Sequence, residues 1–186
     1  TLFRDFKNLY PEIELEVVEA GGIDSLRMIE NEELDLAVTN YDDSFSPNLH
    51  YRKLFKSEAC FCTYPDHPLA QKKYVDTKDI ANEPLVLLNG GFFVNRLIYQ
   101  NFQQALTAPK VILHSSQLHT VKNLISSQIA SSFLMRQAIT ASDNIIPLSL
   151  KKPLFINSGI VTKRGRQIYG DEQKLIEFIY DNQPLG

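Results

Sequence analysis

Apolar and polar positions switch between helical and strand spacing along the first forty residues. Residues 2–9 place apolar side chains on one helical face, and the Tyr10-Pro11 step ends that helix. Residues 13–20 (IELEVVEA) alternate apolar and acidic side chains, which predicts a strand with one face in solvent. A helical pattern over 23–33 leads to the apolar run 34–40, typical of a strand covered on both faces. This order predicts an α/β layer around a largely parallel sheet.

The rest of the chain repeats the strand–turn–helix order. After a β-rich stretch at 49–64, the sequence PDHPLA breaks the pattern and marks a candidate lobe boundary. We expect lobe I at 1–64 plus 160–186 and lobe II at 65–159. The predicted elements beyond the break are strands at 84–88, 111–115, 129–134, 145–150 and 154–162, and helices at 93–105, 117–127 and 167–181.

Composition narrows the class of protein. With 186 residues and 44% apolar content, the chain can fill a proper core. No apolar run approaches the roughly 20 residues of a membrane helix, and the start lacks a signal-peptide pattern, so we expect a cytoplasmic protein without membrane contact. Cys60 and Cys62 are the two cysteines, and alternation along one strand predicts buried, reduced thiols on the same face.

Charge is unevenly distributed. The net charge of −3 argues against this chain holding a nucleic-acid backbone by itself. No acidic residue lies between Pro84 and Ser142, a stretch that carries Arg96, Lys110, Lys122 and Arg136. This asymmetry favours attraction of a small anionic ligand or of an acidic surface on another chain. A solvated surface that simply lacks acids is the alternative.

The segment VILHSSQLHTVKNL (111–124) raises two hypotheses. Ser115 or Ser116 with His114 or His119 could form a hydrolase site, but the surrounding stretch offers no acid and no G-x-S-x-G elbow. We therefore expect no enzymatic activity. In the second hypothesis a serine caps a helix that begins near Gln117, and the first-turn N–H groups face a ligand at the end of the strand. An ordinary capped helix with a solvated histidine is the alternative.

Other strand ends carry similar turns. Residues 89–93 (NGGFF) follow a predicted strand, and two glycines permit close approach of a ligand to the backbone, although a tight turn without a ligand is the alternative. This turn lacks the motif of a phosphate loop or of a dinucleotide fold. Gly21-Gly22 and Thr39-Asn40 end the lobe I elements in the same way, so all these turns would border one cleft if the lobes face each other. The histidines show no metal-ligand spacing, and we expect neither a metal nor a cofactor.

An ordered series of segments then resembles the effector-binding domain of LysR-type transcriptional regulators. The segments are FRDFKNLYPEIELEVVEAGG, ENEELDLAVTN, YPDHPLA, VDTKDIANEPLVLLNGG, SSQLHTVKNLI, and GIVTKRG to IEFIYDN. The resemblance implies an α/β fold of the periplasmic-binding-protein type II kind, with two Rossmann-like lobes joined by two crossover strands and a small effector in the cleft. It also implies a homodimer, a tetramer as a further assembly of the full-length protein, and DNA contact only through an N-terminal helix-turn-helix domain.

The resemblance assigns effector contacts to the turns already described. They are Gly21, Gly22, Thr39, Asn40, Asn89, Gly90, Gly91, Phe92, Phe93, Gln117, His119 and Thr120. Two departures concern the start of the chain, where the DNA-binding domain and the family's first strand are missing, so we expect a fragment that senses without binding an operator. A third concerns residues 127–132, where Gln128 and Ala130 replace a Gly-x-Gly pattern and are expected to narrow the pocket.

Two functions remain open from the sequence. The first is an effector-sensing and dimerisation domain of a transcription regulator, in which a small anionic metabolite shifts the population toward one dimer geometry. The alternative is the solute-binding protein of a transporter, which shares the two-lobed design.

Overall fold

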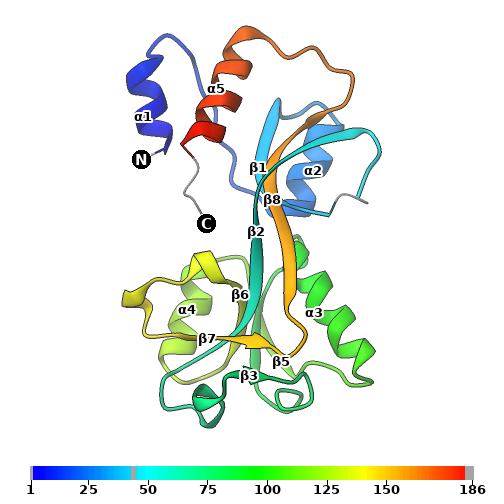
Figure 1. Cartoon of the computed structure of the whole chain (residues 1–186), viewed down its shortest axis with the longest axis vertical. Helices are drawn as coiled ribbons and strands as arrows, with labels where there is room; N and C mark the ends of the chain where they lie inside the picture. The colour runs from blue at the N-terminus through cyan, green and yellow to red at the C-terminus, as the bar shows by residue number, and fades with distance from the viewer. Residues whose placement is uncertain (1, 43–44, 183–186) are drawn as a thin grey trace. The chain divides into compact units, whose positions relative to one another are not determined.

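The computed structural model describes residues 2–42 and 45–182 and divides the chain into two compact units. Unit 1 comprises residues 1–56 and 157–186, and unit 2 comprises residues 57–156. The division points fall inside β2 (Leu49–Thr63) and β8 (Leu154–Lys163), which pair with each other and run from one unit into the other (Figure 1). The two expected crossover strands are therefore present. The lobe boundaries expected from sequence, after residue 64 and before residue 160, lie on the carboxyl side of these points.

Unit 1 is built on an antiparallel strand pair. Its elements are α1 (Leu2–Leu9), α2 (Gly22–Glu30), β1 (Leu36–Tyr41), the unit 1 parts of β2 and β8, and α5 (Gly170–Asp181). β1 pairs with β8 in antiparallel register, with Val38 opposite Ile160. The expectation of a parallel sheet covered on both faces was wrong for β1, because its neighbour β8 runs in the opposite direction and Val38 is half exposed.

Residues 13–20 do not form the predicted strand. Only Ile13 of this segment is buried, whereas Val17 and Val18 are exposed, and none of the residues 14–20 joins a ladder. Alternating side chains define a strand only when a neighbouring strand pairs with its backbone. In the described part of the chain, β1 pairs with β8 alone, so the segment 13–20 has no ladder to join.

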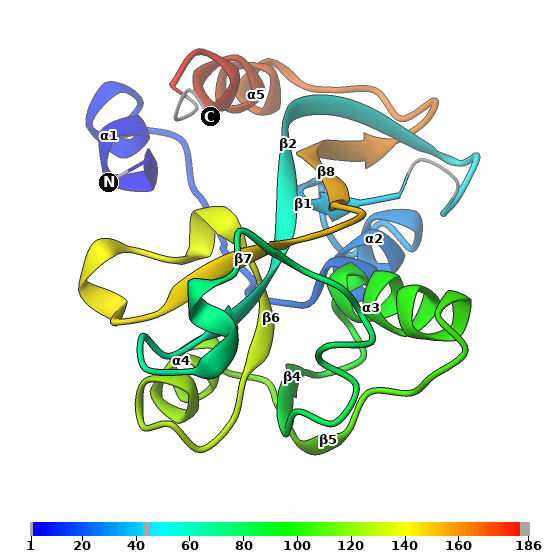
Figure 2. The same cartoon turned by 60° about the horizontal axis from the view of Figure 1, so that its bottom comes forward.

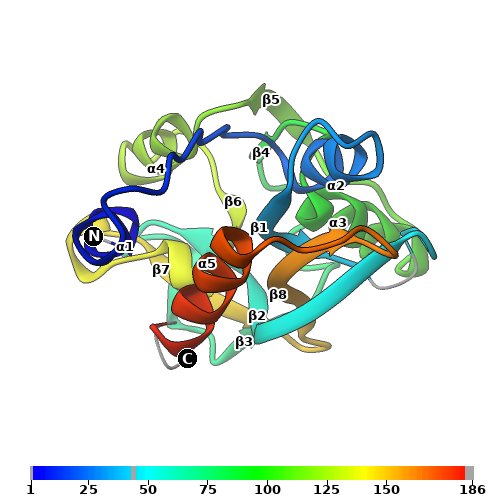
Figure 3. The same ribbon diagram turned by 90° about the horizontal axis from the view of Figure 1, so that it is seen from above.

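The core of unit 1 forms between its two terminal helices and β8. Phe6 of α1 is fully buried and meets Phe178 of α5 edge-on, with ring centroids 5.3 Å apart. Figure 3 shows α1 beside α5. Phe3 and Leu9 were expected on the same buried stripe but are exposed. Fewer side chains of α1 therefore contact the core than its apolar pattern predicted.

Unit 2 carries a mixed sheet. Its strands and helices are β3 (Tyr74–Val75), β4 (Leu85–Leu88), β5 (Val111–Ser115), β6 (Ser132–Met135), β7 (Ile146–Leu150), α3 (Phe93–Gln104) and α4 (Leu118–Ser126). β2 pairs antiparallel with β6 and β7, and β3 pairs parallel with β7. β4 and β5 are parallel, and a parallel bridge between Leu85 and Ser131 connects this pair to the start of β6.

Alternation along the strands separates two cores. Phe61 and Leu87 point to the face covered by α3, whereas Cys60, Cys62 and Val86 point to the face covered by α4 (Figure 2). Both cysteines are buried free thiols on one face, as predicted. The helices α3 and α4 therefore lie on opposite faces of the sheet and connect successive parallel strands. Among the described residues, no helix combines the length and apolarity needed to cross a membrane.

Three helices end in the same backbone motif. Glu32, Leu106 and Gln128 each have positive φ after α2, α3 and α4, and the next N–H bonds a carbonyl five residues back. This is the Schellman arrangement, in which glycine is the usual left-handed residue. Gln128, one of the two residues expected from the resemblance to narrow the pocket, adopts this conformation with φ of 60°. Short 3₁₀ turns complete the unit at Pro68–Gln71, Arg136–Ala138 and Ala141–Asp143.

Candidate functional site

The carboxyl ends of β4 and β5 lie next to each other in unit 2. Leu88 faces Ser115 in the parallel register, and the Asn89 N–H donates to the Ser115 carbonyl at 2.9 Å. The turn after β4 and the segment after β5 therefore leave the sheet at the same edge. Two of the predicted site segments, 89–93 and 117–120, are brought together by this pairing.

The turn after β4 combines exposed polar backbone with aromatic packing. Asn89 and Gly90 are exposed, and a Cβ atom on Gly90 would meet no heavy atom within 4 Å. Phe92 is the N-cap of α3 and packs against both cores, while Phe93 is 3% exposed and belongs to the core. The open space beside Gly90 can accept a ligand close to the backbone, with Phe92 as an apolar neighbour.

Asn95 holds this turn in place, and the sequence analysis did not select it. Its side chain is buried, and its Nδ2 group donates to the carbonyl oxygens of Leu88 and Asn89, the latter at 3.0 Å. Its Oδ1 atom is buried without a hydrogen-bond partner among the described residues. A single asparagine in a predicted helix gives no sequence signal for such a tether, which depends on the tertiary approach of β4 to α3.

The start of α4 differs in detail from the prediction. Gln117, not Ser115 or Ser116, is the N-cap, and no side chain caps the helix. Ser115 Oγ instead accepts the Gln117 N–H at 3.1 Å and so shapes the approach to the helix. The Thr120 hydroxyl donates to Gln117 Oε1 at 3.2 Å, and His119 is exposed. The first-turn N–H groups of α4 therefore remain available to an acceptor at this edge.

The serine–histidine cluster of this segment is not assembled as a nucleophile–base pair. Among the described residues, Ser115 Oγ bonds only to the backbone of Gln117, and His114 Nε2 lies 3.5 Å from the Tyr99 hydroxyl. Within residues 2–42 and 45–182, no hydrogen bond joins Ser115 or Ser116 to a histidine. The arrangement is suited to offering donors to a bound molecule rather than to activating a hydroxyl.

The predicted site residues of unit 1 lie at the amino end of α2 and inside β1. Gly21 is the N-cap of α2 and Gly22 is its buried first residue. Thr39 and Asn40 do not end the strand, which continues to Tyr41. Because the chain reverses between α2 and β1 and the two elements pack together, the amino end of α2 lies toward the carboxyl end of β1.

Asn40 has a partner that the sequence analysis missed. The hydroxyl of Ser158 on β8 donates to Asn40 Oδ1, and these two residues are paired in the antiparallel register. Ser158 is buried, so the hydrogen bond fixes the orientation of the Asn40 amide. The Asn40 nitrogen is then the group left to donate.

Two cations of the acid-free stretch are neutralised by acids outside it. Lys122 Nζ lies 2.8 Å from Asp143 Oδ2, and Arg136 Nη2 lies 2.8 Å from Glu58 Oε2. The hydrogen bond from Lys122 lowers the pKa of Asp143 to about 2, and Thr140 backbone N–H adds to the effect. In the described part of the chain, Arg96 and Lys110 have no ion-pair partner. The positive charge available to an anion is therefore smaller than the sequence suggested.

Metal-ligating side chains do not gather in the part of the chain that the structure describes. Among the described residues, no group of three or more histidine, cysteine, aspartate or glutamate side chains could hold a metal ion. The chemistry of the strand-end site is that of hydrogen-bond donors and helix N–H groups.

Comparison with solved structures shows which fold the chain adopts. The chain superposes on the Synechocystis PCC6803 CcmR regulatory domain in complex with 2-PG, with a TM-score of 0.87, 18% identity, and coverage of 97% of this chain and 88% of that chain. It also superposes on the effector-binding domain of QuiR in complex with shikimate, with a TM-score of 0.78, 19% identity, and coverage of 97% and 87%. These likenesses show the periplasmic-binding-protein type II fold, as expected.

The sequence comparisons identify the family. The model of the LysR substrate binding domain matches residues 1–183, and the chain therefore belongs to this family. The transcriptional dual regulator GltC of Bacillus subtilis is 24% identical over 188 residues, which cover 96% of this chain and 61% of GltC. The regulator MetR of Salmonella typhimurium is 31% identical over 83 residues, 45% of this chain and 26% of MetR. The chain thus spans only part of the length of these curated relatives.

Proposed function

We propose that this chain is the effector-sensing part of a LysR-type transcription regulator. The observation that carries the proposal is the pairing of β4 with β5, which brings the Asn89–Phe92 turn and the uncapped start of α4 to one edge of the sheet. The family and the transcription regulators among its relatives support the same function. These relatives are longer than this chain. We therefore propose control of transcription for the whole protein and effector sensing for the part described by this chain.

The chemistry of the edge favours an effector with hydrogen-bond acceptors. The first-turn N–H groups of α4 carry partial positive charge, and a helix N-terminus stabilises a negative group. Asn89, Gln117 and Thr120 add polar side chains, and Phe92 adds an apolar wall. We therefore propose a small molecule with a carboxylate or a similar anionic group. The protein would bind it without turnover, because the nearby hydroxyls have no base.

The remaining predicted contacts belong to unit 1. We propose that Gly21, Gly22, Thr39 and Asn40 are effector-contacting residues within unit 1. The uncapped N-terminus of α2 and the Asn40 amide, oriented by Ser158, support this role because both present donors. Asn40→Ala and Ser158→Ala test it: each should weaken effector binding, and unchanged affinity in both would contradict an effector-binding role for these unit 1 residues.

A thermal-shift screen with small carboxylates, amino acids and phosphorylated metabolites tests the main proposal. One class should raise the melting temperature saturably by several degrees, because a ligand that binds only the folded state stabilises it. His119→Ala and Thr120→Val should reduce this shift. Ser126→Ala is the matched control, since Ser126 lies at the other end of α4 and bonds the Asn123 carbonyl.

The outcomes of the screen separate the hypotheses. A shift that persists unchanged in His119→Ala and Thr120→Val, while Ser126→Ala also behaves like the parent, would place the ligand elsewhere. A chain that no class of compound stabilises would contradict an effector-sensing role for these residues. Hydrolysis of an ester by the parent, lost in Ser116→Ala, would revive the enzyme hypothesis.

We also propose that the chain forms homodimers. β5 is an edge strand among the described residues, and its Ile112 and Leu113 are exposed, as are Phe3 and Leu9 of α1. Exposed apolar side chains on an edge strand favour contact with a second chain. Sedimentation equilibrium should show a dimer that Ile112→Lys weakens. A monomer at all concentrations would contradict the proposal.

A further inference from the structure

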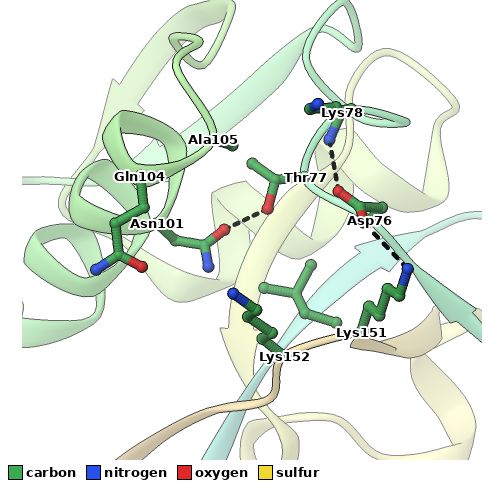
Figure 4. A pocket seen from close by; sticks show the side chains of 9 residues that line it. Asp76, Thr77, Lys78, Asn101, Gln104, Ala105, Lys151 and Lys152 are labelled. Atoms are coloured by element: carbon green, nitrogen blue, oxygen red, sulfur yellow. Dashed lines mark hydrogen bonds and ion pairs between the residues drawn. The ribbon is translucent and has the colours of Figure 1, made fainter.

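Unit 2 contains a hollow built from residues other than those at the ends of β4 and β5. Its volume is about 470 Å³, within the range of small-molecule sites. Three separate segments line it: residues 76–78 after β3, residues 101, 104 and 105 at the end of α3, and residues 150–152 at the end of β7 (Figure 4). All of them belong to unit 2, so the hollow is defined within one compact unit.

The charge lining this hollow is predominantly positive. Lys78, Lys151 and Lys152 contribute three ammonium groups, and Asp76 contributes one carboxylate. The Asp76 carboxylate is already engaged, because Oδ1 accepts the Lys78 backbone N–H at 3.2 Å and Oδ2 lies 3.9 Å from Lys151 Nζ. The ammonium groups of Lys78 and Lys152 have no hydrogen bond or ion pair with any residue that the structure describes. The lining therefore has an excess of two positive charges.

Polar donors supplement these charges. The Thr77 hydroxyl, on a buried residue, donates to Asn101 Oδ1. This bond uses the oxygen of the amide and leaves its Nδ2 group as a donor. Figure 4 shows Lys152 extending toward Asn101, whereas Lys151 extends toward Asp76. Gln104 adds a second amide, and the buried Leu150 forms an apolar floor.

One feature of the lining acts against an anion. The carboxyl end of α3 lies here, and helix carbonyls carry a partial negative charge equivalent to about half a unit. The excess of two ammonium charges is larger than this opposing dipole. The balance favours a ligand that carries more than one negative group, because each added negative group can attract a further lysine of the lining.

We propose that this hollow binds a small polyanion, such as a phosphorylated or polycarboxylate metabolite. Its volume exceeds that of one phosphate ion, and its walls come from three segments rather than from one flat surface, which fits a small molecule. The proposal does not depend on the effector site at β4 and β5, because the two sets of residues do not overlap. Each site can therefore be tested while the other is intact.

The test is a titration of the whole chain with pyrophosphate and with citrate, followed by ¹⁵N–¹H correlation spectra and calorimetry. Saturable shifts should be confined to residues 76–78, 101–105 and 150–152. The double substitution Lys78→Gln with Lys152→Gln should weaken binding by at least about tenfold, as expected for loss of charged hydrogen bonds. Binding of one probe only would distinguish phosphate from carboxylate chemistry.

Two controls make the result specific. Lys110→Gln removes an exposed lysine of the same unit outside the hollow and should leave the affinity unchanged. Thr120→Val alters the proposed effector site and should also leave the affinity of the hollow for the probe unchanged. The proposal is overturned if neither probe binds saturably at millimolar concentration, if the double variant binds like the parent, or if the shifts fall on residues 89–92 and 117–120.

Discussion

Gly159 in β8 faces the carbonyl group of Arg52 in β2 so closely that no side-chain carbon fits between the two strands. A Cβ atom on Gly159 would lie 3.0 Å from the carbonyl carbon of Arg52 and closer still to its oxygen. The obstructing atoms are backbone atoms of a paired strand, so they cannot rotate away. Gly159→Ala should therefore lower the free energy of unfolding by about 1–3 kcal/mol, measured by urea denaturation.

Gly170→Ala is the matched control for this substitution. Gly170 begins α5, and a Cβ atom there would meet no heavy atom within 4 Å. Alanine should be neutral or stabilise by up to about 1 kcal/mol, because glycine has the lower helix propensity. Equal effects of the two substitutions would show that the contact between Gly159 and Arg52 does not limit side-chain size.

The second prediction concerns Leu106, which adopts a left-handed backbone conformation that favours glycine or asparagine. Its φ is 55°, its side chain is 95% exposed, and it ends α3 in the Schellman arrangement. A side chain with a Cβ atom is strained there, and little burial offsets the strain. Leu106→Asn should raise the free energy of unfolding by about 0.5–1 kcal/mol. Leu106→Ala removes the exposed side chain but keeps the Cβ atom, and an equal gain in that variant would contradict the explanation by strain.

The fold was predictable from sequence where local pattern and tertiary pairing agree. The strand at 111–115 and the helix after Phe92 were predicted closely, because apolar spacing and the flanking glycines and proline point to the same structure. The prediction failed at 13–20, since alternation describes side chains and not whether a partner strand is present. It also failed for the direction of β1, because the neighbour β8 follows more than a hundred residues later in the sequence.

The candidate site was predictable only in part. Strand-end reasoning placed Asn89 and Gln117 at the same edge, and the parallel pairing of β4 with β5 brings their segments together. Asn95 and Ser158 were missed because each acts on a group from another segment, which no local motif reveals. Pairing of Lys122 with Asp143 was missed for the same reason, although Asp143 lies just outside the acid-free stretch.

The third prediction concerns the two thiols of β2. Burial raises the pKa of Cys60 to about 12 and also raises the pKa of Cys62. Thiolates are the reactive form, so neither cysteine should react with a disulfide reagent such as Ellman's reagent at pH 8 in the folded protein. Both should react after unfolding in urea, which serves as the internal control. Rapid reaction of either thiol without denaturant would show that the core around α4 opens readily.

The fourth prediction concerns the pH dependence that Asp143 confers. Hydrogen bonds from Lys122 and from the Thr140 N–H hold its pKa at about 2, below the ordinary value of about 3.9 expected in the unfolded chain. The charged carboxylate therefore stabilises the folded state above that unfolded value, and this contribution is lost as the pH falls toward 2. The difference in unfolding free energy between the parent and Asp143→Asn should be largest near neutral pH and shrink below pH about 4.

Lys122→Met should raise the pKa of Asp143 in a carboxyl-carbon NMR titration, because the largest cause of the shift is removed. A titration midpoint for Asp143 that is the same in Lys122→Met and in the parent would show that the ion pair does not form in solution.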